Sequence, residues 1–159
     1  MFNRIRRNDK PIGEILIQRG IIDRFQLDSV LKKQKKENQA TLSGDLMLKL
    51  GMVKEEDIVC AINYQYFVPY LPVNNYEVDF AVIELIPKGL AEKYCLIPLD
   101  KIQNSLTVAM ANPLDIEAIR EIMNITGCNV QAFISTSSEI RRAIHRYYGS
   151  NAKLFSSEF

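Results

Sequence analysis

Apolar residues recur at steps of three and four along the first part of the chain and fall into two segments with the same spacing. Each periodic run is interrupted once by a glycine, Gly20 in the first segment and Gly51 in the second. This pattern predicts two helices separated by a turn, twice over. The segments match at these pairs: Gly13 and Gly44, Leu16 and Met47, Ile17 and Leu48, Gly20 and Gly51, Ile21 and Met52, Ile22 and Val53, Leu27 and Ile58, Leu31 and Ile62, Gln34 and Gln65.

Gly20 and Gly51 are predicted to end the first helix of each segment. A residue just beyond a helix end often takes a positive φ, which glycine adopts without steric cost, and the apolar pair that follows can pack back on the helix. Asp23 and the run Lys54 to Glu56 then open the second helices with mostly acidic first turns, which complement the helix dipole. The polar segment Lys35 to Ala40 is expected to join the copies as a solvated connection.

The hydrophobic pattern changes after the second repeat. Tyr66 to Pro72 is aromatic and partly β-branched and contains two prolines, which is typical of a linker with a short strand. Beyond it, short apolar runs alternate with turn and cap signals. The predicted elements are helices near Ala81 to Leu85 and Lys88 to Tyr94, strands near Leu96 to Leu99 and Leu106 to Ala109 joined by a turn at Lys101 to Ser105, a helix that starts at Pro113 and runs to Thr126, a strand from Val130 to Ile134, and a helix capped by Ser137, Ser138 and Glu139 that ends near Gly149.

These elements predict an α+β fold. The N-terminal part is a four-helix unit of two tandem helical hairpins, and a small α/β sandwich domain with a short mixed sheet follows it. The expected divisions are a helical subdomain at residues 1–66, an α+β subdomain at residues 67–150 and a tail at residues 151–159. The length of 159 residues suits one ordinary domain or two small ones.

Composition narrows the functional classes. The chain has 47% hydrophobic residues and a formal charge of +1, so it has no general attraction to nucleic acid or acidic membranes, and any partner must be recognised through a local site. No apolar run approaches the length of a membrane span, and Met1 to Lys10 lacks the apolar region of a secretory signal. We therefore expect a cytoplasmic location without direct membrane insertion.

Residues that often carry chemistry are scattered. Cys60, Cys95 and Cys128 are odd in number, widely spaced and set in apolar surroundings, which predicts reduced core thiols. No G-x-x-x-x-G-K-[ST] loop is present to hold nucleotide phosphates, and no C-x-x-C or H-E-x-x-H places metal ligands together. His145 lies in a predicted basic terminal helix without a catalytic partner nearby in sequence. We expect no metal site and no enzymatic activity.

Paired acids give no catalytic signal. Glu55 and Glu56 are adjacent on a predicted helix and so do not face each other. Glu77 and Asp79 precede a predicted helix, where solvated capping is the expected role.

The second unit carries a recognisable set of segments: Ile86-Pro87, Ala91, Tyr94, Ile97-Pro98-Leu99, the run Val108 to Asp115, the run Glu139 to Ile144, and Tyr147-Tyr148-Gly149. With the tandem repeat, they resemble the N-terminal domain of type II secretion and type IV pilus assembly ATPases, known as the MshEN or type II secretion E N-terminal domain. The resemblance covers roughly residues 11 to 149. Each piece alone is weak, but the combination is specific.

In that family the repeat is similar to R-L-G-x-x-L-L-x-x-G-L-L-x-x-x-x-L-x-x-x-L-x-x-Q, and two copies bind one cyclic di-GMP. A two-fold symmetric dinucleotide suits two like hairpins, whose glycines allow close approach and whose Gln amides can donate and accept at a polar edge. The resemblance thus implies these candidate ligand residues: Ile12, Gly13, Gly20, Ile21, Leu27, Leu31, Gln34, Ser43, Gly44, Gly51, Met52, Ile58, Ile62 and Gln65.

The chain departs from that repeat at its first position. Pro11 and Leu42 stand where the family has Arg, and Ser43 stands where the second copy would have Leu. Neither Pro nor Leu offers the planar, charged fork of Arg, although Arg6, Arg7 and Lys10 carry charge nearby. Two hypotheses stay open: the repeat still binds cyclic di-GMP, or it serves only as a helical scaffold.

The resemblance implies a docking function. The domain would link a secretion or pilus motor ATPase, in cis or in trans, to the cytoplasmic part of an inner-membrane platform protein, and would reach the membrane only through that partner. The alternative is a cyclic di-GMP sensing module that uses the two repeats. A third function, ATP hydrolysis, lacks its phosphate loop in this sequence.

Overall fold

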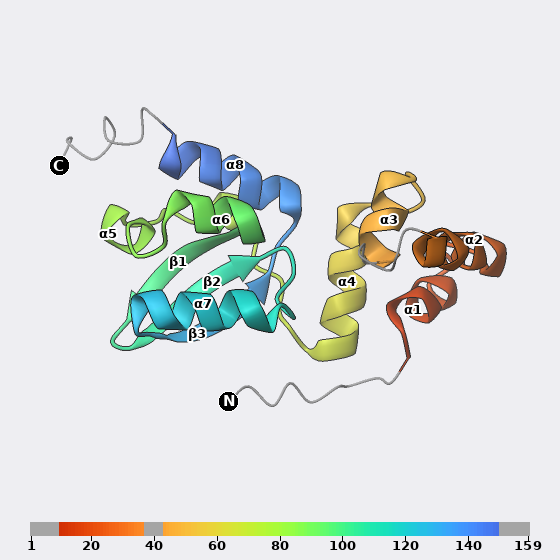
Figure 1. Ribbon diagram of the computed structural model, residues 1–159, viewed down its shortest axis with the longest axis horizontal. Helices are drawn as coiled ribbons and strands as arrows, with labels where there is room; N and C mark the ends of the chain where they lie inside the picture. Colours follow the sequence, from red (N-terminus) through yellow and green to blue (C-terminus); the bar gives the residue numbers. More distant parts are fainter. Residues whose placement is uncertain (1–9, 37–42, 150–159) are drawn as a thin grey trace. The chain divides into compact units, whose positions relative to one another are not determined.

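The computed structural model describes residues 10–36 and 43–149 and divides the chain into two compact units, Met1–Phe67 and Val68–Phe159 (Figure 1). The described part of the first unit is helical, as the repeat predicts. Its helices are α1 (Ile12–Gln18), α2 (Arg24–Lys36), α3 (Ser43–Lys49) and α4 (Glu55–Tyr66). Lys35 and Lys36 still belong to α2, and the rest of the expected connection to Ala40 lies outside the described residues.

The second unit is built on a mixed three-stranded sheet. Strands β1 (Leu96–Ile102) and β2 (Ser105–Met110) are antiparallel, and β3 (Asn129–Ile134) runs parallel to β2. A parallel pair needs a long crossover, and α7 (Ile116–Thr126) supplies it. The remaining elements are η1 (Val73–Asn75), α5 (Phe80–Ile83), α6 (Lys88–Tyr94) and α8 (Ser137–Tyr148). The α+β fold with a short mixed sheet is therefore confirmed.

The core of the second unit lies between the sheet and its helices. Helix α7 contacts β3, whereas α6 and α8 contact β1. Three side chains from one strand and two helices, Leu96, Ile122 and Ile140, have no more than 1% of their surface exposed. Burying apolar side chains at this density is the main source of stability for a domain of this size.

The hairpin between β1 and β2 is tighter than the sequence predicts. Ile102 and Ser105 are paired, so the turn is only Gln103 and Asn104 rather than the whole stretch from Lys101 to Ser105. Gln103 has a φ of 52°, the left-handed conformation that two-residue hairpin turns require. The first four residues of β1 are buried and the last three are exposed, so the apolar run in the sequence ended before the strand does.

Two helix starts also differ from the predictions. Helix α7 begins after Asp115, whose Oδ1 accepts a hydrogen bond from the Ala118 N–H at 3.0 Å, so Pro113 lies before the helix, in a turn. Helix α8 is capped by Thr136 rather than by Ser137, because the Thr136 hydroxyl accepts from the Glu139 N–H at 3.2 Å. Side-chain oxygens placed three residues before a free N–H decide both starts.

The carboxylate of Glu139 is buried and holds the start of the second unit. Tyr70 Oη donates to it at 2.9 Å, Ser135 Oγ at 2.8 Å and Thr136 Oγ1 at 3.0 Å. Burial raises the pKa of Glu139, but these hydrogen bonds outweigh it and hold the pKa below its usual value. Tyr70 also bridges to Ile134, which is the short strand pairing expected after the linker.

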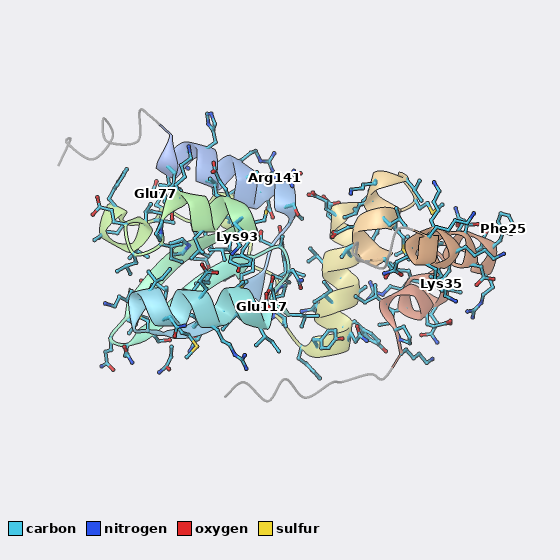
Figure 2. The ribbon with its side chains drawn as sticks, viewed as in Figure 1. Phe25, Lys35, Glu77, Lys93, Glu117 and Arg141 are labelled. Atoms are coloured by element: carbon cyan, nitrogen blue, oxygen red, sulfur yellow. The ribbon has the colours of Figure 1, made fainter. Side chains whose placement is uncertain are left out.

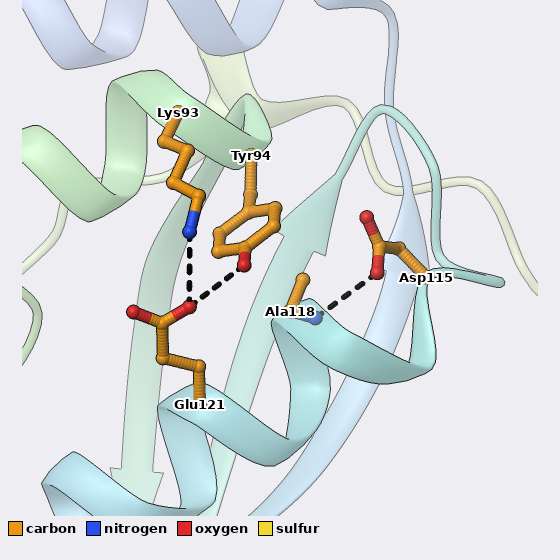
Figure 3. A network of polar contacts seen from close by, with 5 residues as sticks. All are labelled: Lys93, Tyr94, Asp115, Ala118 and Glu121. Atoms are coloured by element: carbon orange, nitrogen blue, oxygen red, sulfur yellow. Dashed lines mark hydrogen bonds and ion pairs between the residues drawn. The ribbon is translucent and has the colours of Figure 1, made fainter. Parts of the chain in front are cut away.

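Helices α6 and α7 are joined by a surface network (Figure 3). The Glu121 carboxylate accepts a hydrogen bond from Tyr94 Oη at 2.7 Å and pairs with Lys93 Nζ at 3.3 Å. Lys93 Nζ also lies 4.4 Å from the centre of the Tyr94 ring. The hydrogen bond from Tyr94 is the largest effect on the pKa of Glu121 and lowers it, whereas burial opposes this and Lys93 lowers the pKa further.

The cysteine prediction is wrong in part. Cys128 is buried, but Cys95 is half-buried at the end of α6 and Cys60 is exposed on α4. The apolar neighbours of Cys60 in sequence lie on other faces of α4, so proximity in sequence misled. No helix in residues 10–36 and 43–149 is long and apolar enough to cross a membrane.

Candidate ligand site in the helical repeats

Both hairpins turn at their glycine in the same way. Gly20 and Gly51 have φ values of 70° and 67°, so the predicted left-handed caps are confirmed. In each turn two backbone N–H groups bond back to carbonyls near the end of the first helix, the pairing that defines a Schellman motif. The bonds run from Gly20 N to Ile17 O at 2.9 Å, Ile21 N to Leu16 O at 3.0 Å, Gly51 N to Leu48 O at 3.0 Å and Met52 N to Met47 O at 3.0 Å.

The second helices begin in related ways. Asp23 Oδ1 accepts from the Gln26 N–H at 2.7 Å, and Gln26 Oε1 accepts from the Asp23 N–H at 2.9 Å. In the second hairpin, Asp57 Oδ2 accepts from the Lys54 N–H at 2.8 Å. A side chain at the third helical position thus fixes the entry of both α2 and α4.

The two hairpins interlock. Helix α1 contacts α4, and α3 contacts α2, so the first helix of each hairpin packs on the second helix of the other; α1 also contacts α3. The apolar core cluster repeats with the sequence, since each of its buried residues in one copy has a buried or half-buried counterpart at the same place in the other. The pairs are Ile15 and Leu46, Leu16 and Met47, Ile22 and Val53, Leu27 and Ile58, and Val30 and Ala61. The unit is therefore pseudo-two-fold symmetric.

A side chain of the same hairpin fills the space beside Gly13 and beside Gly44, but packing requires glycine at position 13 alone of the two. A Cβ on Gly13 would lie 2.5 Å from Leu27 Cδ1, and a Cβ on Gly44 would lie 3.5 Å from Ile58 Cδ1. The sequence hypothesis assigned these glycines to close approach by a ligand. The structure gives the space beside them to a side chain of the same hairpin. This is a separate reason for glycine at position 13, whereas the distance at Gly44 is an ordinary van der Waals contact.

Gln65 is the buried polar residue of the repeat. Its side chain is 1% exposed, and Nε2 donates to the Lys10 carbonyl at 2.7 Å. Its other atom, Oε1, is buried without a hydrogen-bond partner among the residues that the structure describes. A buried amide oxygen without a partner costs about 1–3 kcal/mol, so it favours any ligand that donates to it.

The candidate residues fall into three classes of exposure. Those buried are Gly13, Leu27, Ile62 and Gln65; those half-buried are Ile12, Ile21, Gln34, Ser43, Gly44, Met52 and Ile58; those exposed are Gly20, Leu31 and Gly51. Pro11 is exposed at the start of α1, and Leu42, Arg6 and Arg7 lie outside the described residues. The repeat positions thus build the core and the turns first, and the half-buried set together with Oε1 of Gln65 is what remains for a ligand.

Two arginines that the sequence did not single out lie in the first hairpin. Arg24 forms a two-pronged ion pair with Glu14, and the hydrogen bond from Arg24 is the main reason that the pKa of Glu14 is lowered. The Arg19 guanidinium lies 5.7 Å from the centre of the Tyr64 ring on α4. Repeat spacing could not reveal either group, because neither occupies a repeat position.

The family model of the MshEN domain matches residues 66–153, which is more than half of the chain and includes all described residues of the second unit. The chain belongs to the MshEN domain family. This MshEN chain is also 32% identical over 137 residues to the type IV pilus assembly ATPase PilB of Myxococcus xanthus, a match that covers 86% of the chain and 24% of that protein. PilB of Thermus thermophilus is 25% identical over 142 residues, which are 88% of the chain and 16% of that protein.

Solved structures share the fold of this MshEN chain. A structure of MshE with cdg has a TM-score of 0.73 at 24% identity and covers 87% of the chain and 99% of that structure. The N-terminal domain of XpsE has a TM-score of 0.72 at 21% identity and covers 87% of the chain and 94% of that structure. These matches exceed the length of the second unit, so they extend into the helical repeats. The chain covers about a quarter of the length of the Myxococcus protein and a smaller share of the Thermus protein.

Proposed function

We propose that this domain is a regulatory and docking part of a type IV pilus or type II secretion motor ATPase, and that it links the motor to the cytoplasmic part of an inner-membrane platform protein. The observation that carries the proposal is the match to PilB, which takes in most of this chain but only 24% of that ATPase. A separately folded part of a motor, with no phosphate loop in its own sequence, suits a connecting task better than the chemical step.

The docking function is tested by titrating the purified chain with the purified cytoplasmic part of the platform protein from the same organism. We expect saturable binding in isothermal titration calorimetry and joint elution in gel filtration. A second domain of the same ATPase, added in place of this chain, is the control for non-specific association. Binding by the control alone contradicts the proposal.

A second function, cyclic di-GMP sensing, is favoured by the geometry of the repeats. The interlocked hairpins are pseudo-two-fold symmetric, as the dinucleotide is, and MshE, which shares this fold, has been solved with cdg. Gln65 Oε1 is a buried acceptor without a partner among the described residues, and a guanine edge carries N–H donors that suit it. We propose that Gln65 accepts such a donor, while the half-buried Ile21 and Met52 contact the base faces.

The replaced arginines set the expected affinity. One charge-assisted hydrogen bond contributes about 1.5–3 kcal/mol, so two missing arginines weaken binding about a hundredfold or more. We expect weak binding by the native chain and much tighter binding by the double variant Pro11→Arg with Leu42→Arg. GTP and cyclic di-AMP serve as ligand controls in the same calorimetric titration.

Matched glutamine variants locate the site. Gln65→Ala in the double-arginine background should abolish most of the gain, and Gln34→Ala reports on the same position in the other copy. If cyclic di-GMP gives no heat of binding with the native chain and none with the double-arginine variant, the sensing function is contradicted. The repeat then serves only as a helical scaffold. The docking function does not depend on this result.

A further inference from the structure

A cleft lies between α6 and α8 in the second unit, away from the repeats in sequence. Its volume is about 350 Å³, and it is lined by Lys88, Glu92 and Cys95 on one side and Arg141, Ile144 and His145 on the other. Ile144 is 5% exposed and Cys95 half-buried, so the floor is apolar. A cavity of about 150 Å³ already accepts a benzene ring, so this cleft has room for a large apolar side chain.

The rim of the cleft is basic on the α8 side. Arg141 and His145 are one helical turn apart and exposed, and Arg142 and Arg146 follow them along the outer face of the helix (Figure 2 labels Arg141). Within residues 10–36 and 43–149, no ion pair joins these arginines to a carboxylate. Among the described residues, no carboxylate neutralises these charges, which leaves them for a partner.

The acids near the cleft do little to neutralise this face. The carboxylate of Glu139, the one acid on α8, is buried against Tyr70, Ser135 and Thr136. Glu92 pairs with Lys88 at 3.7 Å, but both side chains are more than half exposed. Exposed pairs of this kind are weak, so Lys88 can exchange Glu92 for a carboxylate of a ligand.

We propose that the cleft between α6 and α8 binds an acidic peptide segment of a partner protein, with one aromatic or large aliphatic side chain in the cavity. The carboxylates on either side of that anchor pair with Arg141, His145 and Lys88. A concave site with an apolar floor favours a peptide over an anionic membrane, whose headgroups would meet the outer arginines but leave the cavity empty. The inference rests on the docking function proposed above for the identity of the partner.

The test uses the full chain and a fluorescein-labelled pentapeptide, Glu-Glu-Phe-Glu-Glu, in fluorescence anisotropy titrations. Arg141→Glu should weaken peptide binding about tenfold or more, because it replaces an attraction by a repulsion at the rim. Arg142→Glu is the matched control, since it makes the same charge change one position along α8 outside the cleft lining. We expect it to change the affinity by about twofold or less.

A second peptide isolates the cavity. Replacing the phenylalanine of the peptide by alanine should weaken binding about tenfold, because the apolar floor loses its occupant. No peptide binding, an equal loss in the two arginine variants, or no dependence on the phenylalanine overturns the inference. Binding to phosphatidylserine vesicles that both arginine variants weaken equally, without peptide binding, identifies a membrane surface and also overturns it.

The platform titration separates this inference from the docking function. If the platform protein binds the native chain and Arg141→Glu leaves that binding and peptide binding unchanged, docking stands and the cleft inference fails. If the peptide binds as expected but the platform protein does not bind the native chain, the chemistry of the cleft stands and the docking proposal fails. Circular dichroism of both arginine variants checks that the fold is intact.

Discussion

The two hairpins of the first unit have the same turns but different packing. In the first hairpin, Leu27 is 5% exposed, and its Cδ1 would lie 2.5 Å from a Cβ added to Gly13. In the second, Ile58 is half-buried, and its Cδ1 would lie 3.5 Å from a Cβ added to Gly44. The order reverses one turn farther along the second helices, where Leu31 is 40% exposed and Ile62 only 6%. A repeated sequence thus fixes repeated local geometry, while each copy meets a different environment.

The largest expected difference concerns the aliphatic side chains beside the two glycines. Leu27→Ala should lower the free energy of unfolding by about 3 kcal/mol, because it leaves a cavity in the core. Ile58→Ala should cost about 1 kcal/mol, since a half-buried site loses less apolar area and can fill with water. Urea unfolding followed by far-UV circular dichroism measures both. Equal losses would mean that the two copies are packed alike.

The glycines themselves give the next largest contrast. Gly13→Ala should destabilise the unit by about 2 kcal/mol through overpacking against Leu27. Gly44→Ala has ordinary contact distance to Ile58 and should be neutral or stabilise by up to about 1 kcal/mol, because alanine favours the helix. Adding Leu27→Val to Gly13→Ala should recover part of the loss by removing the δ carbons. Failure of that rescue would show that the backbone, not Leu27, limits the site.

Substitution of the two turn glycines should destabilise both copies equally. Gly20→Ala and Gly51→Ala each force an L-residue into the left-handed region at an exposed site with nothing within 4 Å of the new Cβ. The expected cost is about 1 kcal/mol for each, from backbone strain alone. Thermal and urea unfolding of the two variants should agree. A clear difference would indicate that one turn carries strain from its packing.

The smallest effect is expected at an ion pair that only the first hairpin has. Arg24 pairs with Glu14, whereas the corresponding residues of the second hairpin are both acids, Glu55 and Asp45. Arg24 is exposed and Glu14 is only half-buried, so the pair is in contact with water, and Arg24→Gln should leave the unfolding midpoint within experimental error at physiological salt. A loss of stability that is measurable at low salt and vanishes at high salt would agree with a weak ion pair in contact with water. A loss that persists at high salt would give this pair a structural role.

Local features could be predicted because their causes lie within a few residues. The positive φ of Gly20 and Gly51, the helix at Lys88 to Tyr94 and the alternation of β3 follow from steric freedom, periodicity and neighbouring polar groups. The prediction failed where two local signals competed. Pro113 can start a helix, but Asp115 offers a side-chain cap closer to the first free N–H groups, and the cap decides.

The sequence by itself determined the repeat, the glycine turns and the α+β fold class, because each depends on short-range backbone preferences and on the spacing of apolar residues. Only the tertiary structure decided which copy buries its side chains, since burial depends on what the other elements place nearby. The hydrogen bond between Gln65 and Lys10 and the cleft beneath Arg141 arise in this way. Each involves residues that are far apart in the sequence, and no spacing or motif in the sequence indicates that they meet. Tertiary packing brings them together.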